Sequence, residues 1–188
     1  AYGHNAVMYA NLMQSEGLAD YLGVAQLAEA KELREAGINL PILLFNSAPK
    51  DWLEYAIEEN ITLPIFTEEA ATEIVSIASE MEKVAKVHLK VDSGMNRIGV
   101  KSVDDALKVA EILVSSDWID LEGVFTHFAD ADEKPANQYT KEQFAFFMEC
   151  TEAIENTCHN FKLRHCCNTS ATTNFPEYHL DMARVGIG

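Results

Sequence analysis

Short apolar runs alternate with longer helix-like segments from one end of the chain to the other, and this alternation most limits the folds open to it. The apolar runs have the length of strands, and apolar residues recur at helical spacing between them. Strands that alternate with helices pair side by side in a parallel sheet of βα units. The pattern predicts strands at residues 21–25, 42–45, 61–66, 84–91, 121–127, 163–167 and 182–187, and helices at residues 4–16, 26–36, 49–59, 67–82, 102–116 and 138–157.

The number of βα units narrows the architecture further. The chain opens on a turn-like Ala1-Tyr2-Gly3-His4 that leads directly into a helix, so a strand is expected ahead of Ala1. That strand would bring the total to eight units, the number that closes a barrel of ~250 residues. We therefore expect residues 1–188 to form one α/β domain, an incomplete (β/α)8 TIM-type barrel. A doubly wound open sheet is the alternative, but its GxGxxG signature is absent.

Composition excludes several classes of partner. The chain carries 30 acidic against 14 basic side chains, for a formal net charge of -16, and 48% of its residues are hydrophobic. We expect no nucleic-acid partner, because phosphate binding depends on clustered Lys and Arg, and the chain has no such block. The apolar runs fall short of the ~18 residues of a membrane span, and no signal peptide pattern is present. We expect a soluble protein without a membrane partner.

The cysteines indicate the compartment. Cys150, Cys158, Cys166 and Cys167 show no paired spacing, and a disulfide scaffold would need more cysteines in a shorter chain. Reduced thiols in the cytoplasm are therefore expected. Adjacent residues of a strand point to opposite faces, so Cys166 and Cys167 would form a poor zinc site with His165. We expect no metal.

One predicted strand, at residues 84–91, combines an apolar and an ionisable face. Leu89 and Val91 lie on the first face, and His88, Lys90 and Asp92 on the second. Helices cover the outside of a barrel, so the ionisable face should point inward. Charges in a barrel interior are costly unless they pair or serve a ligand. Either Lys90 and Asp92 neutralise each other near the rim, or this face binds a ligand.

Polar residues follow several predicted strands, at the barrel end where active sites of this architecture are assembled. Arg97, His127 and Arg184 stand there, with a cluster of Thr and Gly residues. Two arginines and a histidine indicate an anionic ligand. A short helix is predicted to begin at Asn168 and Thr169, where free N–H groups suit a phosphate. The alternative for Thr169 is a plain helix N-cap.

These segments, at these spacings, resemble the alanine racemases, pyridoxal-phosphate enzymes with a (β/α)8 barrel followed by a β domain. The resemblance covers essentially the whole chain. Several of the motifs are specific on their own, and together they make a strong resemblance. The matching segments are residues 1–4, 22–25, 29–30, 41–44, 88–99, 126–129 and 165–187.

The resemblance implies a set of residues that bind the cofactor's phosphate. Tyr2 matches the phosphate-binding tyrosine. Thr169, Gly186 and Ile187 match a cradle made of one hydroxyl and two backbone N–H groups. Thr169 stands where many members have Ser, and the hydroxyl is retained.

The resemblance also implies roles around the cofactor ring. Arg184 matches the arginine that meets the pyridine nitrogen, His127 the histidine that supports it, and Asn168 lies beside them. An arginine stays protonated, so the ring nitrogen gains no proton, which favours racemisation over other pyridoxal chemistry. Arg97 matches the arginine that contacts the phenolic oxygen and the substrate carboxylate. Lys90 matches a lysine that is often N-carboxylated, which requires a lowered pKa because only a neutral amine attacks carbon dioxide.

The function implied is the interconversion of L- and D-alanine by two-base proton transfer on pyridoxal 5'-phosphate, supplying D-alanine for peptidoglycan. The family enzyme is a cytoplasmic homodimer acting on a small amino acid. Its cofactor lysine stands four residues before Tyr2 and its second base is a tyrosine of the partner's C-terminal domain, so we expect no catalytic base in residues 1–188 and no activity from them alone. The alternatives are a serine racemase of the glycopeptide-resistance type and a non-catalytic pyridoxal-phosphate-binding barrel.

Overall fold

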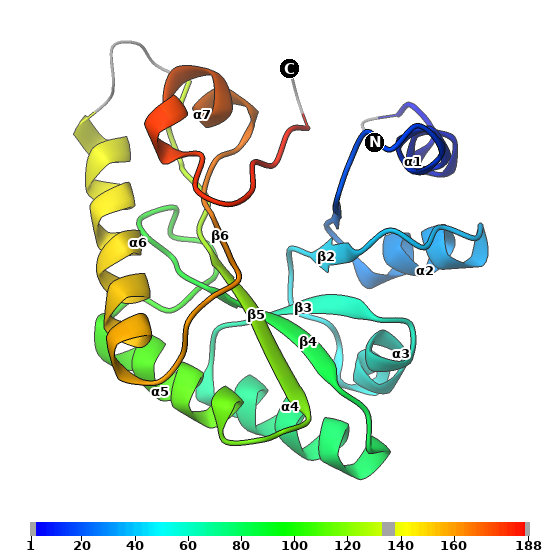
Figure 1. The fold of residues 1–188 in the computed structure, drawn as a ribbon, viewed down its shortest axis with the longest axis horizontal. Coiled ribbons are helices and arrows are strands. Elements are labelled where there is room, and N and C mark those ends of the chain that lie inside the picture. The colour runs from blue at the N-terminus through cyan, green and yellow to red at the C-terminus, as the bar shows by residue number, and fades with distance from the viewer. Residues whose placement is uncertain (1–2, 133–137, 187–188) are drawn as a thin grey trace.

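The fold is a curved parallel sheet surrounded on its outer side by helices (Figure 1), in a computed structural model that describes residues 3–132 and 138–186. The six strands follow one another in chain order, so each pairs with its sequence neighbour. The strands are β1 (Leu22–Val24), β2 (Ile42–Leu44), β3 (Ile61–Ile65), β4 (Ala85–Lys90), β5 (Ile119–Phe125) and β6 (Leu163–His165). The helices are α1 (Ala6–Ser15), α2 (Leu27–Glu35), α3 (Leu53–Glu58), α4 (Glu68–Met81), α5 (Val103–Val114), α6 (Gln138–Thr157) and α7 (Thr169–Asn174), with 3-10 turns at Lys50–Trp52 and Pro176–Tyr178.

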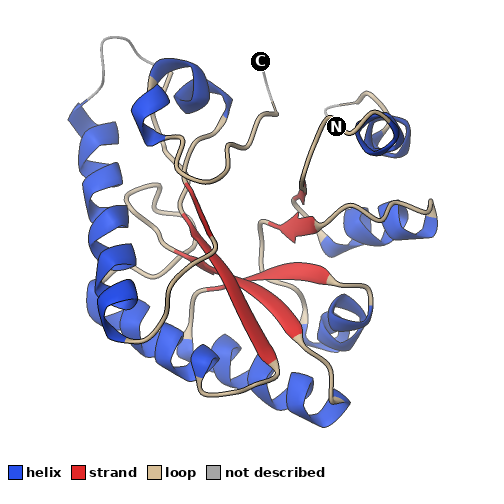
Figure 2. Ribbon diagram, viewed as in Figure 1, coloured by secondary structure: helices blue, strands red, loops and turns tan. Residues whose placement is uncertain are grey.

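The arrangement confirms the incomplete (β/α)8 barrel. Figure 2 shows the strands at the centre and the helices in an arc around them, and the arc is open between α7 and α1. A sheet that adds one strand per βα unit in chain order curves steadily in one direction, as in a barrel. No described helix is both long enough and apolar enough to cross a membrane.

The strand predicted at residues 182–187 is wrong for its described part, residues 182–186, which are irregular. The segment runs past the end of β6, where the N–H groups of Asp181 and Arg184 donate to the carbonyls of Arg164 and Cys167. Two such bonds do not make a ladder, and a strand depends on pairing along its length. The Arg184 side chain instead turns into the barrel interior.

Apolar contacts hold the helices to the outer face of the sheet. Leu89 of β4 and Val109 of α5 are fully buried, and α5 contacts both β4 and β5. The other face of β4 carries His88 and Lys90, which are buried as well. The alternation predicted for this strand is therefore confirmed, with the apolar side chains outside and the ionisable ones inside.

Candidate active site

The carboxyl ends of the parallel strands bring most of the predicted site residues to one edge of the sheet. Lys90 ends β4, His127 follows β5, and Asn168 follows β6 by a few residues. Arg184 reaches the same edge from the irregular segment after α7. The architecture thus gathers residues that are far apart in the chain.

Lys90 lies in the interior near other cations. Its Nζ donates to the backbone oxygen of Phe45 at 2.9 Å and sits 5.1 Å from the centre of the Phe125 ring. Burial, followed by the charges of Arg97 and Arg184, lowers its pKa to about 8. About one tenth of this amine is therefore neutral at pH 7.

Mutual neutralisation of Lys90 and Asp92 is not the arrangement found among the described residues. Asp92 Oδ1 accepts the backbone N–H groups of Gly94 and Asn96, at 3.2 and 2.8 Å. Its Oδ2 lies 3.9 Å from Nζ of Lys101. Asp92 therefore shapes the turn after β4 that carries Arg97, and the Arg97 side chain is exposed there.

Arg184 is fixed by three hydrogen bonds on the inner side of the site. Its Nη1 donates to His165 Nδ1 at 2.7 Å, and its Nη2 donates to the backbone oxygens of Thr126 at 2.7 Å and Cys166 at 3.3 Å. Burial lowers its pKa to about 10, so the guanidinium stays charged at neutral pH. Sequence reasoning missed His165, because a single histidine on a strand gives no signal of its partner.

His127 lies among the cations of the site. Burial, followed by the charges of Arg184, Arg97 and Lys90, lowers its pKa to about 4, so its ring is neutral at neutral pH. Within the described residues, however, the side chain that hydrogen-bonds Arg184 is His165. The His165 contact does not test the expected support of Arg184 by His127, which stays a prediction.

The predicted phosphate cradle is partly in view. Asn168 is the N-cap of α7, since its side chain accepts the N–H of Ala171 at 2.9 Å. The Thr169 hydroxyl is therefore not the N-cap of this helix. It accepts the N–H of Gly186 at 2.8 Å. Tyr2 and Ile187 lie outside the described residues.

The donors at this edge fit pyridoxal phosphate. Arg184 offers a charged guanidinium beside a neutral imidazole, Arg97 is exposed, and a hydroxyl and a backbone N–H meet at Thr169 and Gly186. These groups donate hydrogen bonds or carry positive charge, as a phosphate and a ring acceptor require. Residues of this edge could therefore hold the cofactor.

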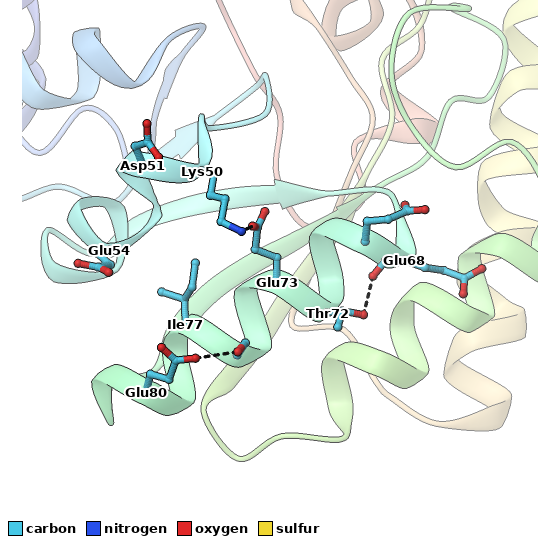
Figure 3. Close-up of a pocket in the computed structure, with 10 residues that line it drawn as sticks. Lys50, Asp51, Glu54, Glu68, Thr72, Glu73, Ile77 and Glu80 are labelled. Carbon is cyan, nitrogen blue, oxygen red and sulfur yellow. Dashed lines mark hydrogen bonds and ion pairs between the residues drawn. The ribbon is translucent and has the colours of Figure 1, made fainter.

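A groove on the outer surface has the opposite character. It encloses about 780 Å³ between α3 and α4 (Figure 3), and Lys50 pairs with Glu73 across it at 2.6 Å. Its other charged residues are acidic, so it would repel an anionic cofactor. Its charged lining is Lys50, Asp51, Glu54, Glu68, Glu69, Glu73 and Glu80.

Comparisons with known proteins agree with the geometry. The profile of the family described as alanine racemase, N-terminal domain, matches residues 1–188. Alanine racemase 2 of Oceanobacillus iheyensis is 47% identical over 187 residues, which are 100% of this chain and 47% of that protein. The alanine racemase of Desulforamulus reducens is 42% identical over 186 residues, 99% of this chain and 50% of that protein.

Solved structures of alanine racemases superpose closely on this chain. An alanine racemase of Clostridium difficile 630 superposes with a TM-score of 0.94 at 38% identity, covering 99% of this chain and 48% of that one. An alanine racemase of Bacillus anthracis, with bound L-Ala-P, has a TM-score of 0.90 at 33% identity, covering 99% and 47%. The chain thus spans about half the length of the relatives it matches. Its sequence and its half-barrel place the chain in the alanine racemase family, within the N-terminal domain.

Proposed function

We propose that the protein containing this chain is an alanine racemase that interconverts L- and D-alanine with pyridoxal 5'-phosphate and supplies D-alanine for peptidoglycan. Residues 1–188 would be its cofactor-binding barrel portion. The observation that carries the proposal is the meeting of charged Arg184, neutral His127 and inward-facing Lys90 at the carboxyl edge of the half-barrel. The names of the relatives support alanine as the substrate.

The residues of the chain bind and orient. Pyridoxal phosphate, when bound, supplies an electron-withdrawing ring that stabilises the charge left at the substrate α-carbon. Arg184 would hold the cofactor ring at its nitrogen, with a guanidinium that keeps its proton. Thr169, Gly186 and, from outside the described residues, Tyr2 and Ile187 bind the phosphate, with Asn168 holding the start of α7.

Arg97 and Lys90 act on the substrate side. The exposed guanidinium of Arg97 would bind the substrate carboxylate and the cofactor's phenolic oxygen through its planar fork of donors. The neutral amine of Lys90, whose pKa is near 8, attacks carbon dioxide. A C–N bond forms, one proton is released to solvent, and a carbamate results. That step turns a cation beside Arg97 into an anion that pairs with it.

Proton transfer itself requires two bases, and we assign neither to residues 1–188. The family resemblance supplies a lysine four residues before Tyr2 and a tyrosine from the partner of a homodimer. This arrangement makes the proposed activity a property of the full protein in its dimeric, cytoplasmic form.

The test is to express the complete coding sequence with pyridoxal phosphate and assay racemisation of alanine and serine side by side. We expect turnover of alanine in clear preference to serine. A preference for serine would replace the substrate assignment, and a cofactor-binding protein that racemises neither amino acid would favour a non-catalytic role. Residues 1–188 alone serve as the control and should show no turnover.

A further inference from the structure

A continuous chain of side-chain hydrogen bonds crosses the barrel interior from Arg184 to Glu122. Arg184 Nη1 lies 2.7 Å from His165 Nδ1, and His165 Nε2 lies 3.0 Å from His88 Nδ1. His88 Nε2 then lies 3.1 Å from Glu122 Oε2. Glu122 is thus joined to the arginine of the proposed site through two imidazole rings.

The groups at the two ends of this series of hydrogen bonds determine the direction in which each bond is donated. A guanidinium has donors and no acceptor, so the Nδ1 of His165 must accept. An ionised carboxylate only accepts, so the Nε2 of His88 must donate. The bond between the rings is then satisfied in one way, with His165 Nε2–H donating to His88 Nδ1. Both histidines are therefore neutral and protonated at Nε2.

Burial keeps both rings in that form. His88 and His165 are 0% exposed. Burial lowers the pKa of each ring, and the charge of Arg184 lowers both further, while Glu122 acts in the opposite sense on His88. The rings therefore carry no charge at neutral pH, which leaves Arg184 as the cation at one end and Glu122 as the anion at the other.

Three donors hold Glu122 as an anion. Burial opposes its ionisation, but hydrogen bonds from His88, Tyr21 and Lys86 outweigh burial and lower its pKa to about 2. The Tyr21 hydroxyl donates at 2.6 Å and Lys86 Nζ at 2.9 Å. The Tyr21 oxygen in turn lies 2.9 Å from the Thr62 hydroxyl. The carboxylate is consequently fixed in place as well as in charge.

A β-bulge gives Glu122 its inward position. Val87 of β4 pairs with Leu121 of β5, but the next residue, His88, pairs with Gly123, so Glu122 is the extra residue on β5. Such a bulge re-aims a side chain. Glu122 and Gly123 consequently both face His88, and a Cβ at Gly123 would lie only 2.9 Å from the His88 ring. The backbone therefore makes room for the ring and its carboxylate together.

We propose that Glu122 is a positioning residue of the racemase, which sets the tautomers of His88 and His165 and thereby the orientation of Arg184 toward the cofactor. The inference rests on the proposed function. No proton has to travel along the chain, because the protonated guanidinium has no site to accept one. Glu122 contributes by fixing the direction in which three successive hydrogen bonds, from Glu122 to Arg184, are donated.

Two substitutions at Glu122 test whether the site depends on the direction of hydrogen bonding or only on the volume of this side chain. Glu122→Met removes the acceptor, so His88 no longer has to donate and the tautomers of both rings are released. Glu122→Gln keeps one oxygen for His88 and Tyr21, and its amide can displace the partly exposed Lys86, so the direction is retained. Glu152→Met, on the exposed part of α6, is the matched control.

The experiment uses the full-length holoenzyme with 15N-labelled histidine and measures the protonation of each ring nitrogen by two-bond NMR correlation. Signals are assigned with His88→Gln and His165→Gln. We expect Nε2–H at both rings in the unaltered protein and in Glu122→Gln, and loss of that pattern in Glu122→Met. We also expect kcat and cofactor affinity of Glu122→Met to fall about 10- to 100-fold, the range typical of lost orienting partners, with KM for alanine little changed.

Nδ1–H at either ring in the unaltered protein would overturn the inference even if no variant folds. Full activity and cofactor affinity in Glu122→Met would overturn it as well, in an enzyme that still racemises alanine. If the unaltered protein racemises nothing, the proposed function fails and the positioning role fails with it, whatever the tautomers are. The two failures are thus told apart by the activity of the unaltered protein.

Discussion

Lys90 shows how a barrel interior changes the chemistry of one residue. An ordinary lysine is almost fully protonated at neutral pH, whereas a pKa of about 8 leaves roughly one tenth of this amine neutral at pH 7. The positive charges of Arg97 and Arg184, which also lower this pKa, favour an anion at this position. The same surroundings therefore promote attack on carbon dioxide and stabilise the product.

We expect the full-length protein, supplied with 13C-labelled bicarbonate, to show a carbamate carbon signal in NMR that Lys90→Arg lacks. A guanidinium has no neutral nitrogen with which to attack. Lys108→Arg, on the exposed part of α5, should leave the signal unchanged. A signal of equal size in Lys90→Arg would place the carbamate elsewhere.

Gly123 is the residue on which the inner packing of β5 depends most closely. An added Cβ would lie 2.7 Å from the Leu163 oxygen and 2.9 Å from the His88 ring, both far inside ordinary contact. Gly123→Ala should lower the free energy of unfolding by about 1–3 kcal/mol, as overpacking does. Denaturant unfolding of the full-length protein measures this, and an unchanged midpoint would contradict the close approach.

Among the elements, α4 and α5 begin next to residues 67 and 102, where the predicted helix ranges start, and each has a side-chain cap. Thr67 accepts the N–H of Ala70, and Ser102 accepts the N–H of Asp105, each at 3.1 Å. These local bonds satisfy donors at the helix start that have no partner within the helix. Both helices can therefore be located from short sequence patterns.

Ser102→Ala should lower the free energy of unfolding by about 1 kcal/mol, because the cap of α5 is lost. Ser76→Ala is the control, since Ser76 lies on the exposed face of α4, where its hydroxyl donates to the exposed Glu80 side chain at 2.9 Å. That change should stay within about 0.5 kcal/mol. Equal losses from the two substitutions would argue against a cap at Ser102.

At the scale of the whole molecule, a group of neutral histidines makes folding sensitive to acid. His88, His127 and His165 all have pKa values lowered by burial, so the unfolded chain binds protons more readily than the folded one. The stability is complete above the ordinary histidine pKa of about 6.5 and is lost as pH falls below it. For His127, with a folded pKa of about 4, the loss is complete near pH 4.

In the cofactor-free full-length protein, the free energy of unfolding should therefore fall between about pH 6.5 and pH 4, and His127 alone should contribute roughly 3 kcal/mol of the fall. Urea unfolding at a series of pH values measures the slope. His127→Gln cannot titrate and should flatten the curve by about that amount. An identical curve for this variant would mean that the pKa of His127 is the same in the folded and unfolded chains.

Local sequence patterns were enough to predict the alternation of strands and helices, the incomplete barrel, the inward face of β4 and the residues at the carboxyl edge. Those features depend on periodicity and on capping partners a few residues away, which are written in order along the chain. The exception is the segment at 182–186, where apolar character predicts a strand. Among the described residues, one backbone bond from this segment, Arg184 N–H to the Cys167 oxygen, reaches the chain just after β6.

Which side chains meet depends on the three-dimensional packing of the chain. Tyr21 and Glu122 are 101 residues apart, and His88 and His165 are 77 apart. The contact of Glu122 with His88 depends on one bulge, which breaks the two-residue period of β5 and cannot be inferred from a strand's own sequence. Local pattern therefore fixes which elements form, while strand register, set by packing across the whole sheet, fixes the partners that support the site.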